Sequence, residues 1–115
     1  MSPVDPARAV PIASAGELDD WLARSGASAP GVVVAIFNRR SGRQTVTLVE
    51  LQEVAVCHGW VDTQTRRIDE QRYAIRFVPR RPRSHWSEKN RTMARRLLAA
   101  GRIRPAGVAT LPGDL

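Results

Sequence analysis

The chain has 115 residues, of which 43% are hydrophobic and 25% charged, and a formal net charge of +7, an ordinary composition for one globular domain. Its single cysteine excludes an internal disulfide, and its longest apolar run, residues 31–37, falls short of the ~18 residues that a membrane span needs. Residues 1–57 hold five arginines against six acids, whereas residues 58–115 hold thirteen basic residues against five acids, and this asymmetry favours an anionic partner.

The first third of the chain predicts a leader, a helix and a strand. Residues 1–13 hold three prolines and no periodicity, so we expect a flexible leader. The leader has no basic start followed by an apolar run, so we expect no secretory signal and a cytoplasmic protein. Ser14 and Glu17 form a capping box for a helix over 15–24. Residues 32–38 are apolar on both faces, which is typical of a central strand.

The middle of the chain predicts a second helix. Thr47 and Glu50 have capping-box spacing, and apolar residues recur at helical intervals over 48–58. Cys57 belongs to this helix, whose apolar stripe must face a sheet, and we predict that it is buried and unreactive.

The C-terminal half predicts a β-hairpin followed by helices. Residues 60–67 and 72–78 alternate between polar and apolar side chains and are joined by a short acidic turn. Prolines end the second strand, and Ser84 or Ser87 caps a third helix over 87–100. A final short helix follows over 105–111.

These elements predict a single α+β domain over residues 14–111, with a tail at 112–115. We expect a small, mainly antiparallel three-stranded sheet packed by about three helices, plus a short C-terminal helix. The strand order stays open. The helix over 48–58 could return the chain as a parallel crossover, which would make the sheet mixed.

A longer pattern runs from Gly59 to Gly107. It reads Gly-Trp-Val-Asp, then Tyr-x-x-Arg-Phe-x-Pro-Arg, then Ser-x-Trp-Ser-x-x-Asn, and finally Gly-x-Ile-x-Pro-Ala-Gly. This pattern resembles the YdeI/OmpD-associated family, also called bacteriocin-protection proteins, over about residues 14–111. That family more often has an aromatic residue where His58 stands and a glycine where Thr63 stands. The resemblance implies a non-catalytic protein with a role in envelope stress or in resistance to antimicrobial peptides.

Catalytic, metal and cofactor motifs are missing from the sequence. Cys57 and His58 are adjacent on a helix and cannot face each other, so a nucleophilic pair would need His85 brought close by the fold. Cys57, His58, Asp62 and His85 have no recognised metal-ligand spacing, and no phosphate-binding or nucleotide-binding glycine motif is present. We therefore predict no enzyme activity, no metal and no cofactor.

The start of the third helix is the candidate binding site. A helix N-terminus presents unpaired N–H groups, and arginines just ahead of it can complete a cradle for a carboxylate or a phosphate. We expect Asp62 or Asp69 to hold Arg76 and Arg80 there, with Trp60 or Trp86 as an apolar wall. The alternative is structural, with the acids as ion-pair partners and the serines as caps only. The candidate ligand-binding residues are Trp60, Asp62, Asp69, Tyr73, Arg76, Arg80, Ser84, Trp86, Ser87 and Asn90.

Two classes of partner stay open. One is a small anionic ligand or a protein partner bound at this site, and the other is nucleic acid or an acidic surface held weakly by bulk charge. Five arginines outside the pattern are expected to face solvent and to serve solubility or loose attraction to anions; they are Arg66, Arg67, Arg91, Arg95 and Arg102. The oligomeric state cannot be inferred from the sequence.

Overall fold

The computed structural model describes residues 4–115, so the first three residues of the predicted leader lie outside the described part. Four helices are present in that part: α1 (Ala15–Ser25), α2 (Leu48–His58), α3 (Glu88–Ala99) and α4 (Pro105–Val108). The strands are β1 (Val10–Pro11), β2 (Val32–Phe37), β3 (Trp60–Arg67) and β4 (Arg72–Pro79), and two short 3-10 turns are η1 (Pro6–Arg8) and η2 (Arg39–Ser41).

The sheet has four strands in the order β1-β2-β4-β3. β4 pairs antiparallel with both β2 and β3, whereas β1 pairs parallel with β2. The α+β class is confirmed, and two of the three strand pairings are antiparallel as predicted. The prediction of three strands is wrong, because β1 adds a fourth strand whose parallel pairing with β2 makes the sheet mixed. A two-residue strand that contains a proline shows no alternation in the sequence, and it forms only where β2 already offers an edge.

Helix α2 carries the chain from β2 to β3 as a crossover. Both strands are antiparallel to β4, so they run parallel to each other with β4 inserted between them. The shorter crossover from β1 through α1 leads directly to the neighbouring strand β2. The fold therefore consists of two overlapping crossovers closed by one hairpin.

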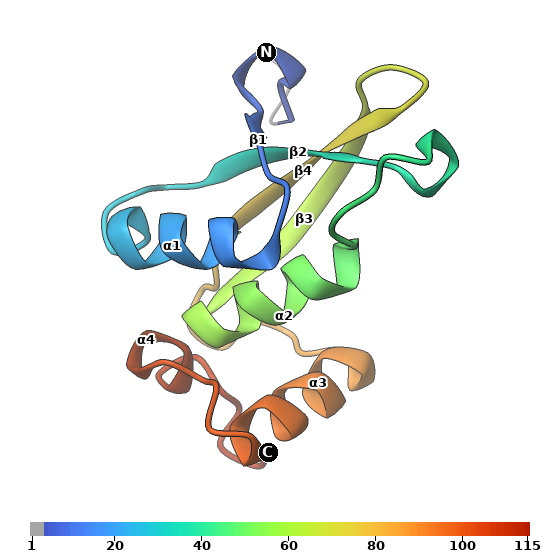
Figure 1. Ribbon diagram of the computed structural model, residues 1–115. Helices are drawn as coiled ribbons and strands as arrows, with labels where there is room; N and C mark the ends of the chain where they lie inside the picture. The colour runs from blue at the N-terminus through green and yellow to red at the C-terminus, as the bar shows by residue number, and fades with distance from the viewer. Residues whose placement is uncertain (1–3) are drawn as a thin grey trace.

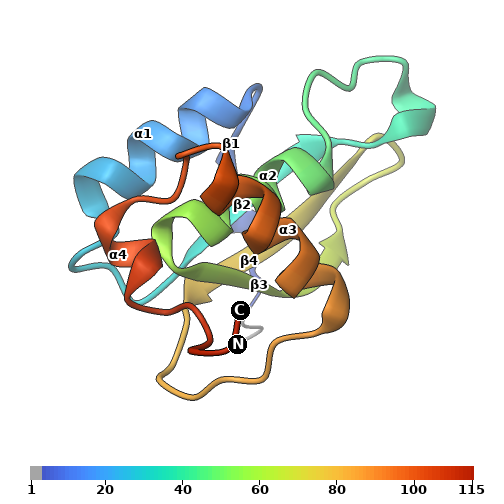
Figure 2. The same cartoon turned by 90° about the horizontal axis from the view of Figure 1, so that it is seen from below.

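The helices all lie on one side of the sheet and form two layers (Figures 1 and 2). α1 and α2 cover the sheet, and α3 and α4 pack on the side of α2 that faces away from it. The opposite face of the sheet carries no α-helix among residues 4–115, although the short η1 turn contacts β2 there. Arg76 of β4 lies on this open face, because it alternates with the core residues Ile75 and Phe77, and it pairs across the sheet with Val33 and Gln64.

Capping side chains set where the helices begin. Ser14 and Thr47 each accept a hydrogen bond from the backbone of a glutamate three residues on, and both predicted capping boxes are present. At the start of α3 the cap is Ser87, whose hydroxyl accepts from the Asn90 N–H at 3.1 Å. The Ser87 hydroxyl is thus used by the helix itself.

The buried side chains form two hydrophobic clusters that share α2. The larger cluster lies between the sheet and the inner helices and includes Leu18, Leu51, Ile75 and Phe77, each 0% exposed. The smaller cluster lies between α2 and α3, and its members are Val56, Cys57, Trp86, Met93, Ala94 and Leu97. Residues Leu48–His58 therefore contribute to both cores, which explains why this helix is apolar over most of its circumference.

Two glycines allow α4 to pack closely against the end of α2. Gly59 ends α2 in the left-handed conformation, with φ 77°, which a residue without a Cβ adopts readily. Gly107 of α4 lies against Cys57, and a Cβ at this position would come within 2.8 Å of the Cys57 carbonyl carbon. The carbonyl oxygen of Cys57 also accepts the Arg104 N–H at 2.9 Å, so the two chain segments are in backbone contact.

We expect the substitution Gly107→Ala to destabilise the protein by about 1–3 kcal/mol, since the added methyl group must push α4 away from α2. Urea denaturation followed by circular dichroism measures the loss. Gly113→Ala is the matched control, because nothing lies within 4 Å of a Cβ built there. Its free energy of unfolding should change by less than about 0.5 kcal/mol. Equal midpoints for the two variants would contradict the close contact between α4 and α2.

Candidate anion site

Arg80 is the most unusual charged residue of the structure. It follows the last residue of β4, where its N–H donates to the Gly59 carbonyl at 2.9 Å, and it is only 8% exposed. Its guanidinium lies over the Trp86 ring, 3.7 Å from the ring centroid. Nη1 donates to the Ser84 hydroxyl at 2.9 Å and to the His85 carbonyl at 3.2 Å. The cation is thus stacked on an aromatic ring and held by neutral acceptors.

The charge of Arg80 is not neutralised by a close acid. No carboxylate within residues 4–115 comes within ion-pair distance of its guanidinium, and its Nε is buried without a hydrogen-bond partner. Burial lowers the pKa of Arg80, and the more distant Asp62 carboxylate opposes that shift. A buried cation with an unused donor is costly unless an anion or water completes its environment.

An open pocket of about 610 Å³ lies beside Arg80, on the helix-free face of the sheet. Arg76, Arg80 and Arg81 supply positive charge, and Thr63 and Ser84 supply hydroxyls. No acidic side chain of the described residues lines the pocket. Neither Arg76 nor Arg81 forms an ion pair with any residue of the described chain. Apolar side chains form the rest of the wall, and these are Pro30, Val61, Val78, Pro79 and Pro82.

The loop after β4 brings these groups together. Pro79 and Pro82 prevent the strand from continuing, and Arg83 adopts a left-handed backbone with φ 61°, which is uncommon for a residue other than glycine. A turn closed by the Ser84 N–H and the Arg81 carbonyl, 3.1 Å apart, directs the chain toward α3. The loop therefore returns over the end of β4 and places the Ser84 hydroxyl beside the Arg80 guanidinium.

Only part of the predicted binding set meets at this place. Arg76, Arg80 and Ser84 line the pocket, and Trp86 lies under Arg80. Ser87 caps α3, and its hydroxyl accepts the N–H of Asn90 in the first turn. The structure thus keeps the arginines, Ser84 and Trp86 together, whereas the Ser87 hydroxyl serves as the helix cap.

The other predicted site residues lie elsewhere. Trp60 is 3% exposed in the larger hydrophobic cluster, where it makes an edge-to-face contact with Trp21 at 6.1 Å. Asp62 points to the helix side of the sheet and accepts from Gln52 of α2 at 3.3 Å. Tyr73 packs against the larger cluster, and burial raises the pKa of its phenol.

The prediction that Asp62 or Asp69 holds Arg76 and Arg80 is wrong. Asp69 lies in the turn between β3 and β4, where it pairs with Arg72 at 3.1 Å. Arg76 is four residues further along the strand, roughly 13 Å away. Asp62 points to the opposite face of the sheet from Arg76, because directly paired residues share a face and Asp62 pairs with Phe77.

A second pocket, of about 740 Å³, lies at the far end of the hairpin. It is bounded by the η2 turn, by the end of β3 and by the Tyr73 ring, and its charged residues are Arg39, Arg40, Arg66, Arg67, Asp69, Glu70 and Arg72. Arg39, Arg40 and Arg66 are exposed and form no ion pair with any residue from 4 to 115. We call this the distal pocket.

The arginines of the C-terminal segment behave differently, because each has an acidic partner. Arg95 pairs with Glu88, Arg102 with Glu53, and Arg91 with Asp114 at 3.2 Å. The prediction that these residues face solvent is wrong for Arg91, whose side chain is only 19% exposed. The positive charge around α3 is therefore partly neutralised by acids. Near the end of β4, Arg76, Arg80 and Arg81 have no ion-pair partner within residues 4–115.

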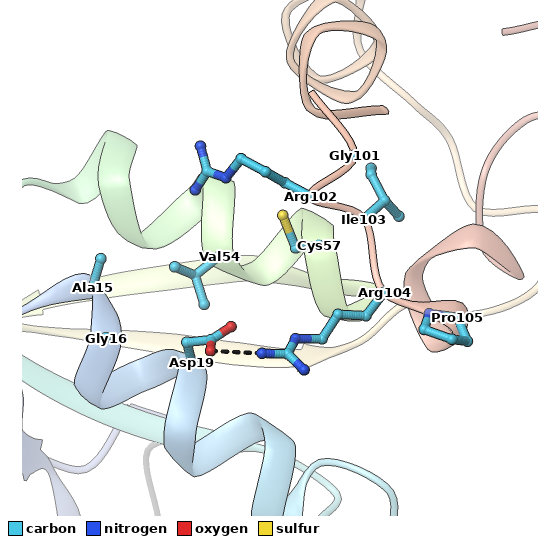
Figure 3. A pocket seen from close by; sticks show the side chains of 10 residues that line it. All are labelled: Ala15, Gly16, Asp19, Val54, Cys57, Gly101, Arg102, Ile103, Arg104 and Pro105. Atoms are coloured by element: carbon cyan, nitrogen blue, oxygen red, sulfur yellow. Dashed lines mark hydrogen bonds and ion pairs between the residues drawn. The ribbon is translucent and has the colours of Figure 1, made fainter. Parts of the chain in front are cut away.

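Sequence reasoning missed a charged cluster beside a third pocket, of about 630 Å³ (Figure 3). Asp19 of α1 accepts from the His58 ring at 2.8 Å and from Arg104 at 2.8 Å, and so joins α1, α2 and the segment before α4. Burial by itself would raise the pKa of Asp19, but hydrogen bonds from His58 and Arg104 hold it below its ordinary value. Asp19 is 39 residues from His58 and 85 residues from Arg104 in the sequence, so no local pattern predicts this cluster.

Cys57 also lines this third pocket but is 4% exposed, and burial raises the pKa of its thiol. Among residues 4–115, no group of three or more histidines, cysteines and acids is arranged to hold a metal ion. Within the same range no helix has both the length and the apolar composition that crossing a bilayer requires.

These features define a small α+β domain with a buried arginine beside an open, acid-free pocket. The chain belongs to the family described as a domain of unknown function, DUF8412, whose model matches residues 10–110. No curated protein and no solved structure matches the chain.

This family match overturns the resemblance to the YdeI/OmpD-associated family. Several residues of the pattern have structural uses that explain how it could mislead. Gly59 ends a helix, Gly107 permits a close backbone contact, Ser87 caps α3, and Trp60 fills the core. Such requirements arise wherever a helix, a hairpin and two further helices pack in this way.

We predict that Asp19→Asn lowers the stability at pH 7 by about 1–3 kcal/mol, because it weakens two charge-assisted hydrogen bonds. The folded-state pKa of Asp19 lies below its unfolded value, so the ionised carboxylate stabilises the fold above about pH 4. This contribution is lost as the pH falls through the folded-state pKa. The difference between the two proteins should therefore shrink in acid, as measured by urea denaturation from pH 7 to pH 3.

Asp20→Asn is the control for this measurement, since Asp20 is exposed and its carboxylate forms no ion pair with any residue from 4 to 115. It should leave the stability nearly unchanged at every pH. A stability loss in Asp19→Asn that does not vary with pH would show that the carboxylate charge is not what joins the helices.

We also predict that Cys57 in the native protein reacts with a thiol reagent only as fast as the protein opens. The thiol is buried, and its raised pKa leaves little thiolate at neutral pH. Labelling with an aromatic disulfide at pH 8 should be slow and should accelerate in urea together with unfolding. Fast labelling of the folded protein would contradict a buried, unreactive thiol.

Proposed function

We propose that this protein is a non-catalytic binding module whose pocket at Arg76, Arg80 and Arg81 holds a small anion with an apolar body. A carboxylate or a phosphate group would lie among the guanidiniums. The observation that carries the proposal is Arg80, a buried cation with an unused Nε and no carboxylate within ion-pair distance among residues 4–115.

The chemistry of the pocket supports an anion over a neutral ligand. Three guanidiniums offer forked donors that match the oxygens of a carboxylate or a phosphate, and the hydroxyls of Thr63 and Ser84 can add further donors. The pocket contains no acid that would repel such a group. Its proline and valine walls favour a ligand whose remaining part is apolar.

A second candidate is loose binding of nucleic acid or of an acidic surface through bulk charge. Arg39, Arg40 and Arg66 around the distal pocket favour it, because they are exposed and form no ion pair within residues 4–115. Against it, the arginines on and after α3 are already paired with acids. Salt separates the two candidates, because bulk-charge binding weakens steeply as salt rises.

We also propose that the protein works in the cytoplasm. The sequence holds one cysteine, and its thiol is buried and free, which suits a reducing compartment. Fractionation of cells that produce the full-length protein would test this placement.

The binding proposal is tested by thermal shift with hexanoate, with its neutral counterpart hexanamide, and with inorganic phosphate, each at low and at high salt. Hexanoate should raise the melting temperature in both salts and hexanamide should not, because only the carboxylate can engage the guanidiniums. Arg76→Ala and Arg81→Ala should remove the shift. Losing a charged hydrogen bond costs about 1.5–3 kcal/mol, which weakens binding roughly tenfold or more.

Arg95→Ala is the matched control, since it removes an exposed arginine that is paired with Glu88 on α3. It should keep the full response to hexanoate. Arg80→Ala is informative only together with these variants, because losing its contact with Trp86 can also lower stability. If the Arg81→Ala and Arg95→Ala proteins respond alike, the pocket does not bind the anion and the proposal fails.

A further inference from the structure

Strand β3 forms one edge of the sheet. It pairs with β4 on one side, and no strand of residues 4–115 pairs with its other side. The side chains from Thr63 to Arg67 are all exposed. A free strand edge offers a row of backbone donors and acceptors, and an extended chain can satisfy them by adding a strand.

The same strand links the two arginine-rich pockets. The anion pocket reaches β3 at Val61 and Thr63, and the distal pocket reaches it at Thr65, Arg66 and Arg67. Six residue steps of an extended strand cover roughly 20 Å. One extended segment of about that length would therefore touch both pockets while it pairs with the edge between them.

The side chains along this edge alternate between the faces of the sheet. Thr65 pairs with the core residue Ile75 and lies on the helix side, and Arg67 shares that side, whereas Arg66 pairs with Ala74 on the open side. A strand added to β3 would thus meet a guanidinium on each face near the distal pocket. Acidic side chains on both faces of the added strand would find a partner.

We infer that the ligand of the anion pocket is the C-terminal carboxylate of an extended, acid-rich peptide that adds to the β3 edge. This inference rests on the proposed function and names the class of its ligand. The peptide runs antiparallel to β3, because its end lies at Val61 and its upstream residues lie toward Arg67. The terminal apolar side chain packs against Val61 and Val78, and the carboxylate meets Arg76, Arg80 and Arg81.

A second copy of the chain fits this edge less well. A second copy would add its own exposed Arg66 and Arg67 to an edge that already carries these two arginines, in a protein with a net charge of +7. An acidic partner relieves the repulsion that a second copy would create.

Fluorescence anisotropy with the full-length protein tests the inference. The probe is a labelled eight-residue peptide, Glu-Glu-Thr-Thr-Glu-Glu-Thr-Val, which places glutamates on both faces of an added strand and ends in a free carboxylate. Its comparison is the amidated peptide with one added N-terminal glutamate, so that the two probes carry the same charge. The free acid should bind about tenfold tighter than the amide, since only it can pair with the arginine cluster.

A second comparison tests strand addition. Two peptides are N-methylated at alternate residues, one at the odd positions and the other at the even positions. Only one of them loses the N–H groups that face β3. That peptide should bind roughly tenfold more weakly than the parent peptide, and the other methylated peptide should bind as the parent does. Arg66→Ala should also weaken binding, and Arg95→Ala should not.

The outcomes separate this inference from the proposed function. If the acid and the amide bind equally, or if neither methylated peptide loses affinity, the peptide inference is overturned. If hexanoate still binds in a manner that depends on Arg81, the anion pocket itself stands. If neither hexanoate nor the peptide binds, both fail. If an oligothymidylate of equal charge displaces the peptide with a steeper salt dependence, the edge is a nucleic-acid surface and the inference is wrong.

Discussion

The packing of α2 between the sheet and the outer helices is the contact on which the rest of the fold depends. Its residues Leu51 and Val54 fill the larger cluster, and Val56 and Cys57 fill the smaller one. Most helices in a domain of this size expose one face to solvent. The last turn of α2 exposes little of its surface, and even His58 is buried there. The outer helices have no sheet to pack on and bury their apolar faces only because α2 offers a second one.

The anion pocket is a product of the same arrangement. Gly59, at the end of α2, accepts the Arg80 N–H and so fixes where the chain leaves β4. Trp86 belongs to the smaller cluster, and its ring supports the Arg80 guanidinium. The cation is thus held between the sheet layer and the outer helical layer. Its position follows from how the layers meet and does not need a dedicated ion pair.

Local signals predict the elements well and the site only in part. The bounds of α2 and β3 coincide with their predicted ranges, because caps and alternation act within a few residues. Arg80, Ser84 and Trp86 are close in the chain, so their meeting could be predicted. Asp69 was predicted to lie beside Arg76 and Arg80, but it lies in the turn that joins β3 to β4, at the opposite end of the hairpin from Arg80. Contacts such as that between Asp19 and Arg104 arise only from packing, and no local pattern specifies them.

The division of the core into two clusters has a consequence for how the molecule opens. The α3–α4 layer is joined to the sheet layer through α2, the loop after β4 and the ion pair between Arg104 and Asp19 of α1. An opening of the outer layer that leaves the larger cluster closed has to break these contacts. Such an opening would remove the Trp86 ring from beneath the guanidinium and dismantle the pocket. An occupant of the pocket would then act as a latch, slowing amide hydrogen exchange in the outer layer more than in the sheet.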